Sequence, residues 1–177
     1  MILFLVLAQA AAPAPAPATP PAPWVPRERA NAGGGSSLTA STTASDGSSR
    51  LVVKCDRGAE PVVSVQFIAK QPLQVAGDDG SYPDKVVALR FDNGPAIGYT
   101  WQLRGNAAYD AAPADVTALT MFLVKAKSVR VETTNGAGFA FNATFAAPPS
   151  DAPVRQVLSA CGYTLGTVPA PLAAKPK

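Results

Sequence analysis

Apolar and polar residues alternate along three pairs of neighbouring segments, and each pair predicts a β-hairpin. The first pair occupies residues 51–55 and 62–68, the second 85–91 and 96–103, and the third 128–134 and 138–146. Polar turn sequences such as Asp92-Asn93-Gly94-Pro95 and Asn135-Gly136 separate the members of a pair, which is typical of antiparallel strands. The positions expected to face the core are Val63, Val65, Phe67, Tyr99, Trp101, Phe139, Phe141 and Phe145.

Two further segments change from strand periodicity to helix periodicity. Residues 113–126 place five apolar side chains on one helical face: Val116, Leu119, Phe122, Leu123 and Ala126. Residues 151–161 do the same at i, i+3, i+4 and i+7, with Val154, Val157, Leu158 and Cys161. The order of elements therefore predicts an α+β fold, mainly antiparallel β, in which three hairpins form a sheet or sandwich with two packed helices.

The segments on either side of this pattern predict the domain organisation. Residues 1–10 form an apolar run that ends in Ala8-Gln9-Ala10, which indicates the remnant of a secretory signal and a mature chain beginning near Ala11. Residues 11–36 are rich in Pro, Ala and Gly and predict a linker, extended where Ala and Pro alternate. A single β-rich domain is expected over 37–165, with a weak strand at 37–43, and a disordered tail over 166–177. Trp24 either docks on the domain or stays exposed in the linker.

Charge and composition narrow the function classes. The 177 residues include 15 Lys and Arg against 12 Asp and Glu, and the net charge of +3 is spread along the chain rather than collected in one run. Nucleic acid is therefore not an expected partner. Histidine is absent, which excludes His-dependent catalytic triads and His-containing zinc sites within this chain. We expect no cofactor and no catalytic residue.

The two cysteines predict a compartment and a covalent bond. Cys55 and Cys161 are far apart in the sequence, neither belongs to a CxxC motif, and each falls on the apolar face of its element. An oxidised structural pair in an exported protein fits this pattern better than a redox or metal site. We therefore predict a Cys55–Cys161 disulfide and a periplasmic or secreted location.

One acidic loop is the candidate site for contacts with a partner. Asp78, Asp79, Tyr82 and Asp84 lie in the polar stretch between the first two hairpins. The three aspartates could also bind calcium, although their spacing does not match an EF-hand, and a solvated acidic loop explains them equally well. A carboxylate pair for cell-wall hydrolysis could be drawn from Asp84 and Asp92, but no spacing rule selects them.

Several short motifs together resemble a known family. LVVKC on an early strand, VVALRFDNGPAIGYTWQL, FLVKAKSVRVET and the closing VLSACGY are similar to the periplasmic VasI-type proteins associated with type VI secretion, over about 50–163. The resemblance implies a periplasmic accessory protein, and Tyr163 replaces the tryptophan that usually closes this pattern. Invasion-associated locus B proteins share the two-cysteine, β-rich character and give a second, weaker resemblance.

These observations lead to three functional hypotheses. The first is an exported, non-enzymatic accessory or interaction domain of the bacterial envelope, whose partner is an envelope protein or a cell-wall polymer. The second is a carboxylate-dependent, cell-wall-active hydrolase, and the third is a structural envelope protein. For the first, we expect the contact surface on the hairpin loops or on an exposed sheet edge, where backbone groups can pair with a partner.

Overall fold

The computed structural model describes residues 24–31, 34–73 and 84–170, which form a nine-stranded antiparallel open sheet with two helices. The strand order is β1-β2-β3-β4-β7-β6-β5-β8-β9. The bounds of the strands are β1 Arg27–Ala30, β2 Ser36–Thr43, β3 Ser49–Arg57, β4 Val62–Ala69, β5 Lys85–Phe91, β6 Ala96–Arg104, β7 Ala107–Asp110, β8 Ser128–Thr134 and β9 Ala140–Ala146. The helices are α1 Pro113–Lys125 and α2 Ala152–Ala160. The predicted α+β class with mainly antiparallel strands is confirmed.

The three predicted hairpins are the pairs β3–β4, β5–β6 and β8–β9. Two strands had no counterpart in the sequence prediction. β1 lies within the stretch assigned to the linker, and its four exposed residues carry no apolar alternation. β7 is also four residues long, yet it pairs with both β4 and β6 and so joins the first hairpin to the second.

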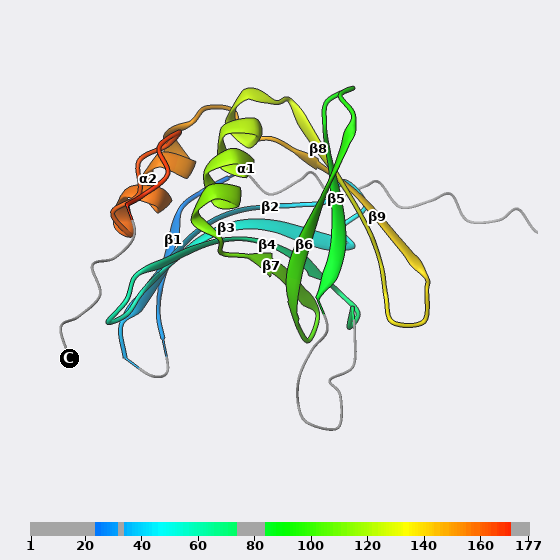
Figure 1. Ribbon diagram of the computed structural model, residues 1–177, viewed down its shortest axis with the longest axis horizontal. Coiled ribbons are helices and arrows are strands. Elements are labelled where there is room, and N and C mark those ends of the chain that lie inside the picture. The colour runs from blue at the N-terminus through cyan, green and yellow to red at the C-terminus, as the bar shows by residue number, and fades with distance from the viewer. Residues whose placement is uncertain (1–23, 32–33, 74–83, 171–177) are drawn as a thin grey trace, which may run out of the picture.

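The sheet bends where β6 changes partner. Residues 96–101 of β6 pair with β5, whereas residues 102–104 pair with β7. Figure 1 shows β5, β6, β8 and β9 crossing the direction of β2, β3 and β4, with both helices on one side of those three strands. The bend lets the two ends of the sheet share one core, in which the rings of Phe67 on β4 and Phe145 on β9 meet edge to face at 6.2 Å.

The core confirms most of the predicted inward positions. Val63, Val65, Phe67, Trp101 and Phe145 are buried, while Tyr99 and Phe141 are half-buried and pack against the core. Helix α1 adds Val116, Leu119 and Leu123, and α2 adds Val154, Val157 and Leu158.

One predicted core position was wrong, and one residue on the predicted apolar face of α1 is exposed. Phe139 is 70% exposed because it precedes β9, in a loop where the carboxamide oxygen of Asn135 accepts the backbone N–H of Phe139 at 2.9 Å. Phe122 is 43% exposed on α1, and one face of its ring stacks on Phe91 with the centroids 5.3 Å apart. For Phe139 the alternate spacing of phenylalanines continued past the start of β9, and for Phe122 the apolar face of the helix was wider than the core that covers it.

Trp24 docks on the domain. Its side chain is 3% exposed, and its indole N–H donates a 2.8 Å hydrogen bond to the carbonyl of Ala146 at the end of β9. The backbone N–H of Ser45, between β2 and β3, also donates to the carbonyl of Thr144 on β9 at 2.9 Å. The first contact holds the start of the described chain against β9, and the second links the β2–β3 connection to the same strand.

Candidate functional site: a cationic groove on the outer face

Strands β1 to β4 present two chemically different faces. On β3, Leu51, Val53 and Cys55 point towards the helices and the core, while the alternate residues point to the opposite side, which we call the outer face. On β2 the outer face carries only hydroxyl side chains: Ser37, Thr39, Ser41 and Thr43. The alternation that predicted these strands therefore also builds a continuous polar surface.

The outer face is hollowed into a concavity of about 380 Å³, here called the cationic groove. Its described lining consists of Val25, Arg27, Arg29, Ser37, Thr39, Ser41, Thr43, Arg50, Val52, Lys54, Gln66 and Ile68. Four of these residues are basic, and the described lining contains no Asp or Glu. The groove therefore gathers positive charge that the sequence distributes over two separate segments.

Strand register explains why basic residues that are far apart in the sequence line the same groove. Arg27 on β1 lies opposite Thr39 on β2, and Thr39 in turn lies opposite Lys54 on β3. Neighbouring strands are about 4.8 Å apart, so cations on β1 and β3 flank the hydroxyl row of β2 at a separation of roughly 10 Å. β1 and β3 thus place basic side chains on both sides of a neutral, hydrogen-bonding strip, and Asp56 shares the outer face of β3 opposite Ser37.

The basic side chains of the groove differ in how far they are neutralised. Lys54 forms an ion pair with Asp56 at 2.9 Å, and Arg50 donates to the hydroxyl of Ser41 at 3.1 Å. Within the described part of the chain, the guanidinium groups of Arg27 and Arg29 have no ion-pair or hydrogen-bond partner, and both residues are exposed. Two full positive charges at one wall are therefore available to a ligand.

The floor of the groove is closed rather than open to the core. Val52 is 2% exposed, Ser37 is 5% exposed, and neighbouring Ser64 is 4% exposed and accepts a 2.8 Å hydrogen bond from Gln66. Because these side chains are packed, the groove is a shallow surface and not a channel into the fold. Such a surface suits the binding of an extended ligand.

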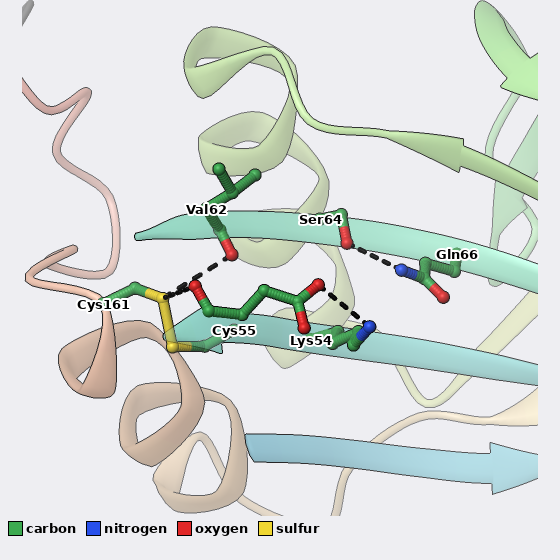
Figure 2. Close-up of polar contacts among 7 residues, drawn as sticks. Lys54, Cys55, Val62, Ser64, Gln66 and Cys161 are labelled. Atoms are coloured by element: carbon green, nitrogen blue, oxygen red, sulfur yellow. Dashed lines mark hydrogen bonds and ion pairs between the residues drawn. A yellow bond between two sulfur atoms is a disulfide. The ribbon is translucent and has the colours of Figure 1, made fainter. Parts of the chain in front are cut away.

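The predicted disulfide is confirmed. Cys55 at the inner face of β3 is bonded to Cys161 just after α2, with the Cα atoms 5.8 Å apart, and Figure 2 shows the bond beside Lys54 and Val62. The Cys161 Sγ also lies 3.5 Å from the carbonyl oxygen of Val62, a contact without a shared proton because an oxidised sulfur carries none. The bond holds α2 against the strand that carries Arg50 and Lys54.

Of the four residues predicted as an interaction loop, only Asp84 is described, and it does not line the groove. Asp78, Asp79 and Tyr82 lie outside the described residues, and Asp84 is exposed just before β5. Asp92 has a turn role, since its carboxylate accepts the backbone N–H groups of Lys127 and Ser128 at 2.8 and 2.9 Å. These hydrogen bonds hold the pKa of the Asp92 carboxyl below its ordinary value.

Two titratable groups with raised pKa values, Asp110 and Tyr99, lie near the junction of β7 and α1. Burial raises the pKa of Asp110, whose carboxylate accepts the backbone N–H of Ala112 at 2.8 Å. Burial also raises the pKa of the Tyr99 phenol, helped by the negative charges of Asp115 and Asp110. Asp110 therefore resists ionisation while it positions the start of α1.

A second, apolar concavity of about 1020 Å³ has Cys161 of the disulfide in its lining. Its lining includes Pro61, Val62, Pro113, Tyr163 and Val168, and Glu60 is its single described carboxylate. Neither concavity thus combines two described carboxylates. In the described segments, no group of three or more His, Cys, Asp or Glu side chains could hold a metal ion.

The cationic groove was missed by sequence reasoning. Sequence inspection detects basic residues that are neighbours along the chain. The basic residues of this groove come instead from two separate segments, 27–29 and 50–54. The sequence RERA did show that Arg27 and Arg29 would share one face of a strand, because they alternate with Glu28 and Ala30. Only the pairing of β1, β2 and β3 converts that alternation into one charged face.

Comparison with known proteins gives no further guide. No protein-family model matches the chain, and neither the curated proteins nor the solved structures include a match. Across 24–31, 34–73 and 84–170, no helix is long and apolar enough to cross a membrane.

Proposed function

We propose that this chain is an exported, non-enzymatic binding module of the bacterial envelope that holds its partner in the cationic groove. The observation that carries the proposal is the pair Arg27 and Arg29, two exposed guanidinium groups without described partners at the wall of a concavity. Unpaired arginines beside a hydroxyl row are suited to binding an anionic partner, and the closed floor gives that partner a surface to lie on.

The disulfide supports the proposed compartment. A bond between Cys55 and Cys161 is consistent with folding in an oxidising, extracytoplasmic environment. The Pro/Ala-rich stretch before Trp24 fits a spacer that holds the domain away from its point of attachment or exit. This is the accessory role that the resemblance to VasI-type proteins implies, with the contact surface moved from loops and edges to the face of the sheet.

The proposal is tested by sedimentation of the full chain with washed bacterial envelopes. We expect the wild-type protein to sediment and to be released by raised salt, because salt screens exposed charges. Arg27→Gln combined with Arg29→Gln should leave the protein in the supernatant. The matched control is Lys125→Gln with Lys127→Gln, which removes the same charge from exposed positions at the end of α1.

Equal sedimentation of the arginine variant and the wild type would place the binding surface elsewhere. Release of soluble envelope fragments during long incubation would contradict a non-enzymatic role. Thermal unfolding of each variant shows whether a loss of binding follows from a loss of folding.

A further inference from the structure

The cationic groove has a chemical pattern that narrows the class of its ligand. The cations stand in two rows, on β1 and β3, and the hydroxyls of β2 lie between them. Alternate residues of a strand repeat about every 7 Å, so a ligand running along β2 would meet the hydroxyls of Thr39, Ser41 and Thr43 in succession. Arg27 and Lys54 flank Thr39, and Arg50 lies beside Thr43. The groove therefore fits an extended polymer that bears both anionic groups and hydroxyl groups.

The side chains of the strip match sugar hydroxyls in particular. Ser and Thr hydroxyls both donate and accept hydrogen bonds, as the hydroxyls of a sugar do. Of the β2 hydroxyls, that of Thr39 donates weakly to the Arg27 carbonyl at 3.3 Å and that of Ser41 accepts from Arg50. Each hydroxyl of this pair keeps hydrogen-bonding capacity for a ligand, since a hydroxyl makes up to three hydrogen bonds.

Two other classes of anionic polymer fit less well. Proteins that hold single-stranded nucleic acid stack bases on aromatic side chains, and none of the described lining residues is aromatic. A peptide would gain its main affinity by pairing its backbone with a sheet edge, whereas the groove lies on the face of the strands, where side chains and not backbone groups are presented.

We infer that the groove binds an anionic polysaccharide, whose carboxylate or phosphate groups lie against Arg27, Arg29 and Arg50 while its hydroxyls meet the β2 strip. This inference rests on the proposed function and names the chemistry of the partner. Arginine is suited to the task because its planar guanidinium can bind a carboxylate or phosphate through two parallel hydrogen bonds.

The test compares four polymers by titration calorimetry with the full chain: polygalacturonate, uncharged dextran, polyglutamate and an oligothymidylate. Polygalacturonate should bind, and dextran should not. Arg27→Gln with Arg29→Gln should weaken polygalacturonate binding by about tenfold or more, because two charge-assisted contacts are lost.

The decisive variant keeps every charge and removes hydroxyls only. Thr39→Val with Thr43→Val preserves shape and strand preference, and it should weaken polygalacturonate by about threefold to tenfold, the effect of losing one or two neutral hydrogen bonds. The same variant should leave any binding of polyglutamate unchanged. The matched control, Thr117→Val, changes a threonine on α1 that is far from the groove in the fold.

The outcomes separate this inference from the proposed function. Preferred binding of polyglutamate or the oligonucleotide, or an unchanged affinity for polygalacturonate in Thr39→Val with Thr43→Val, overturns the polysaccharide assignment. Absence of any binding to polygalacturonate also overturns it. Envelope sedimentation that still depends on Arg27 and Arg29 would in each case leave the proposed function standing.

Discussion

The two ends of the sheet use the same alternation of residues but treat their outward charges differently. On β8, Arg130 pairs with Glu132 at 2.9 Å and donates to Asn142 at 2.7 Å, so its charge is locally matched. On β1, Arg27 and Arg29 have no such partners in the described chain. The face that carries β1 is therefore the better candidate for binding an anion, because two of its charges are left unmatched.

The ends also differ in how they are fixed to the rest of the fold. β2, β3 and β4 lie under the helices, and the disulfide ties β3 to the end of α2. β5, β8 and β9 are held by core packing and by turn contacts such as those of Asp92. Substitutions at Cys55, Trp24, Asp92 and Asp110 test this difference.

Removing the disulfide should have the largest effect. The cysteines are 106 positions apart, and closing a loop of that length stabilises a fold by about 4 to 5 kcal/mol in the chain-entropy model, with smaller values often measured. We expect Cys55→Ser to lower the melting temperature about as much as the double serine variant does. A single variant that unfolds like the wild type would show that the bond adds no stability.

Truncating Trp24 should weaken the contact between the start of the domain and β9. Because the indole is buried, Trp24→Ala should cost about 3 kcal/mol in the free energy of unfolding, measured by denaturant titration. Trp24→Phe keeps an aromatic ring and loses the hydrogen bond to Ala146, so it should cost roughly 1 kcal/mol. Equal losses for the two variants would show that the hydrogen bond, and not the packing, dominates.

Removing the Asp92 carboxylate should destabilise the β5–β6 end of the sheet. Asp92 has a φ of 50°, in the left-handed region, so Asp92→Ala adds strain as it loses two backbone contacts, whereas Asp92→Asn tolerates that conformation. The pKa of the carboxyl is lowered on folding, so its contribution is present above the ordinary value of 3.8 and is lost as pH falls through the lowered pKa. Melting temperatures of Asp92→Asn and wild type should therefore converge in acid.

Asp110 should show the opposite pH dependence with a smaller amplitude. Burial raises its pKa on folding, so the stability of the protonated form is present below 3.8 and is lost as pH rises through the raised pKa. Asp110→Asn mimics the protonated group and keeps an oxygen for the Ala112 N–H. The variant should melt slightly above wild type at neutral pH and level with it in acid. A lower melting temperature at neutral pH would show that the negative charge stabilises α1.

Sequence periodicity was sufficient for the longer elements that bury one apolar face, but not for the four-residue β7, whose buried positions are Ala108 and Asp110. The alternation in β3, β4, β5, β6, β8 and β9, and the helical spacing in α1 and α2, reflect burial and predicted the elements closely. β1 has the sequence RERA and buries none of its residues, so no periodic signal marks it. The disulfide was predictable because only two cysteines exist and both fall on inward positions.

The groove was not predictable because it depends on pairing and not on periodicity. Arg27 and Lys54 lie on the same face because β1 pairs with β2 and β2 pairs with β3 in particular registers. No property of either segment alone fixes those registers. The turn between β1 and β2 contributes to the pairing. Gly35 has a φ of +80°, and a Cβ there would overlap the carbonyl oxygen of Arg57 on β3. Gly35 is thus required both by its backbone conformation and by the close approach of β3.

The position of the disulfide also decides how the domain responds to mechanical force. A pull between Trp24 and Ala170 would pass along β1, β2 and β3 as far as Cys55, and would then cross the covalent bond to Cys161. Strands β4 to β9 and both helices lie between the two cysteines and outside that path. Only β1 to β3 and the short segment after Cys161 can be extended until the bond is reduced, so the strands that line the groove bear the load.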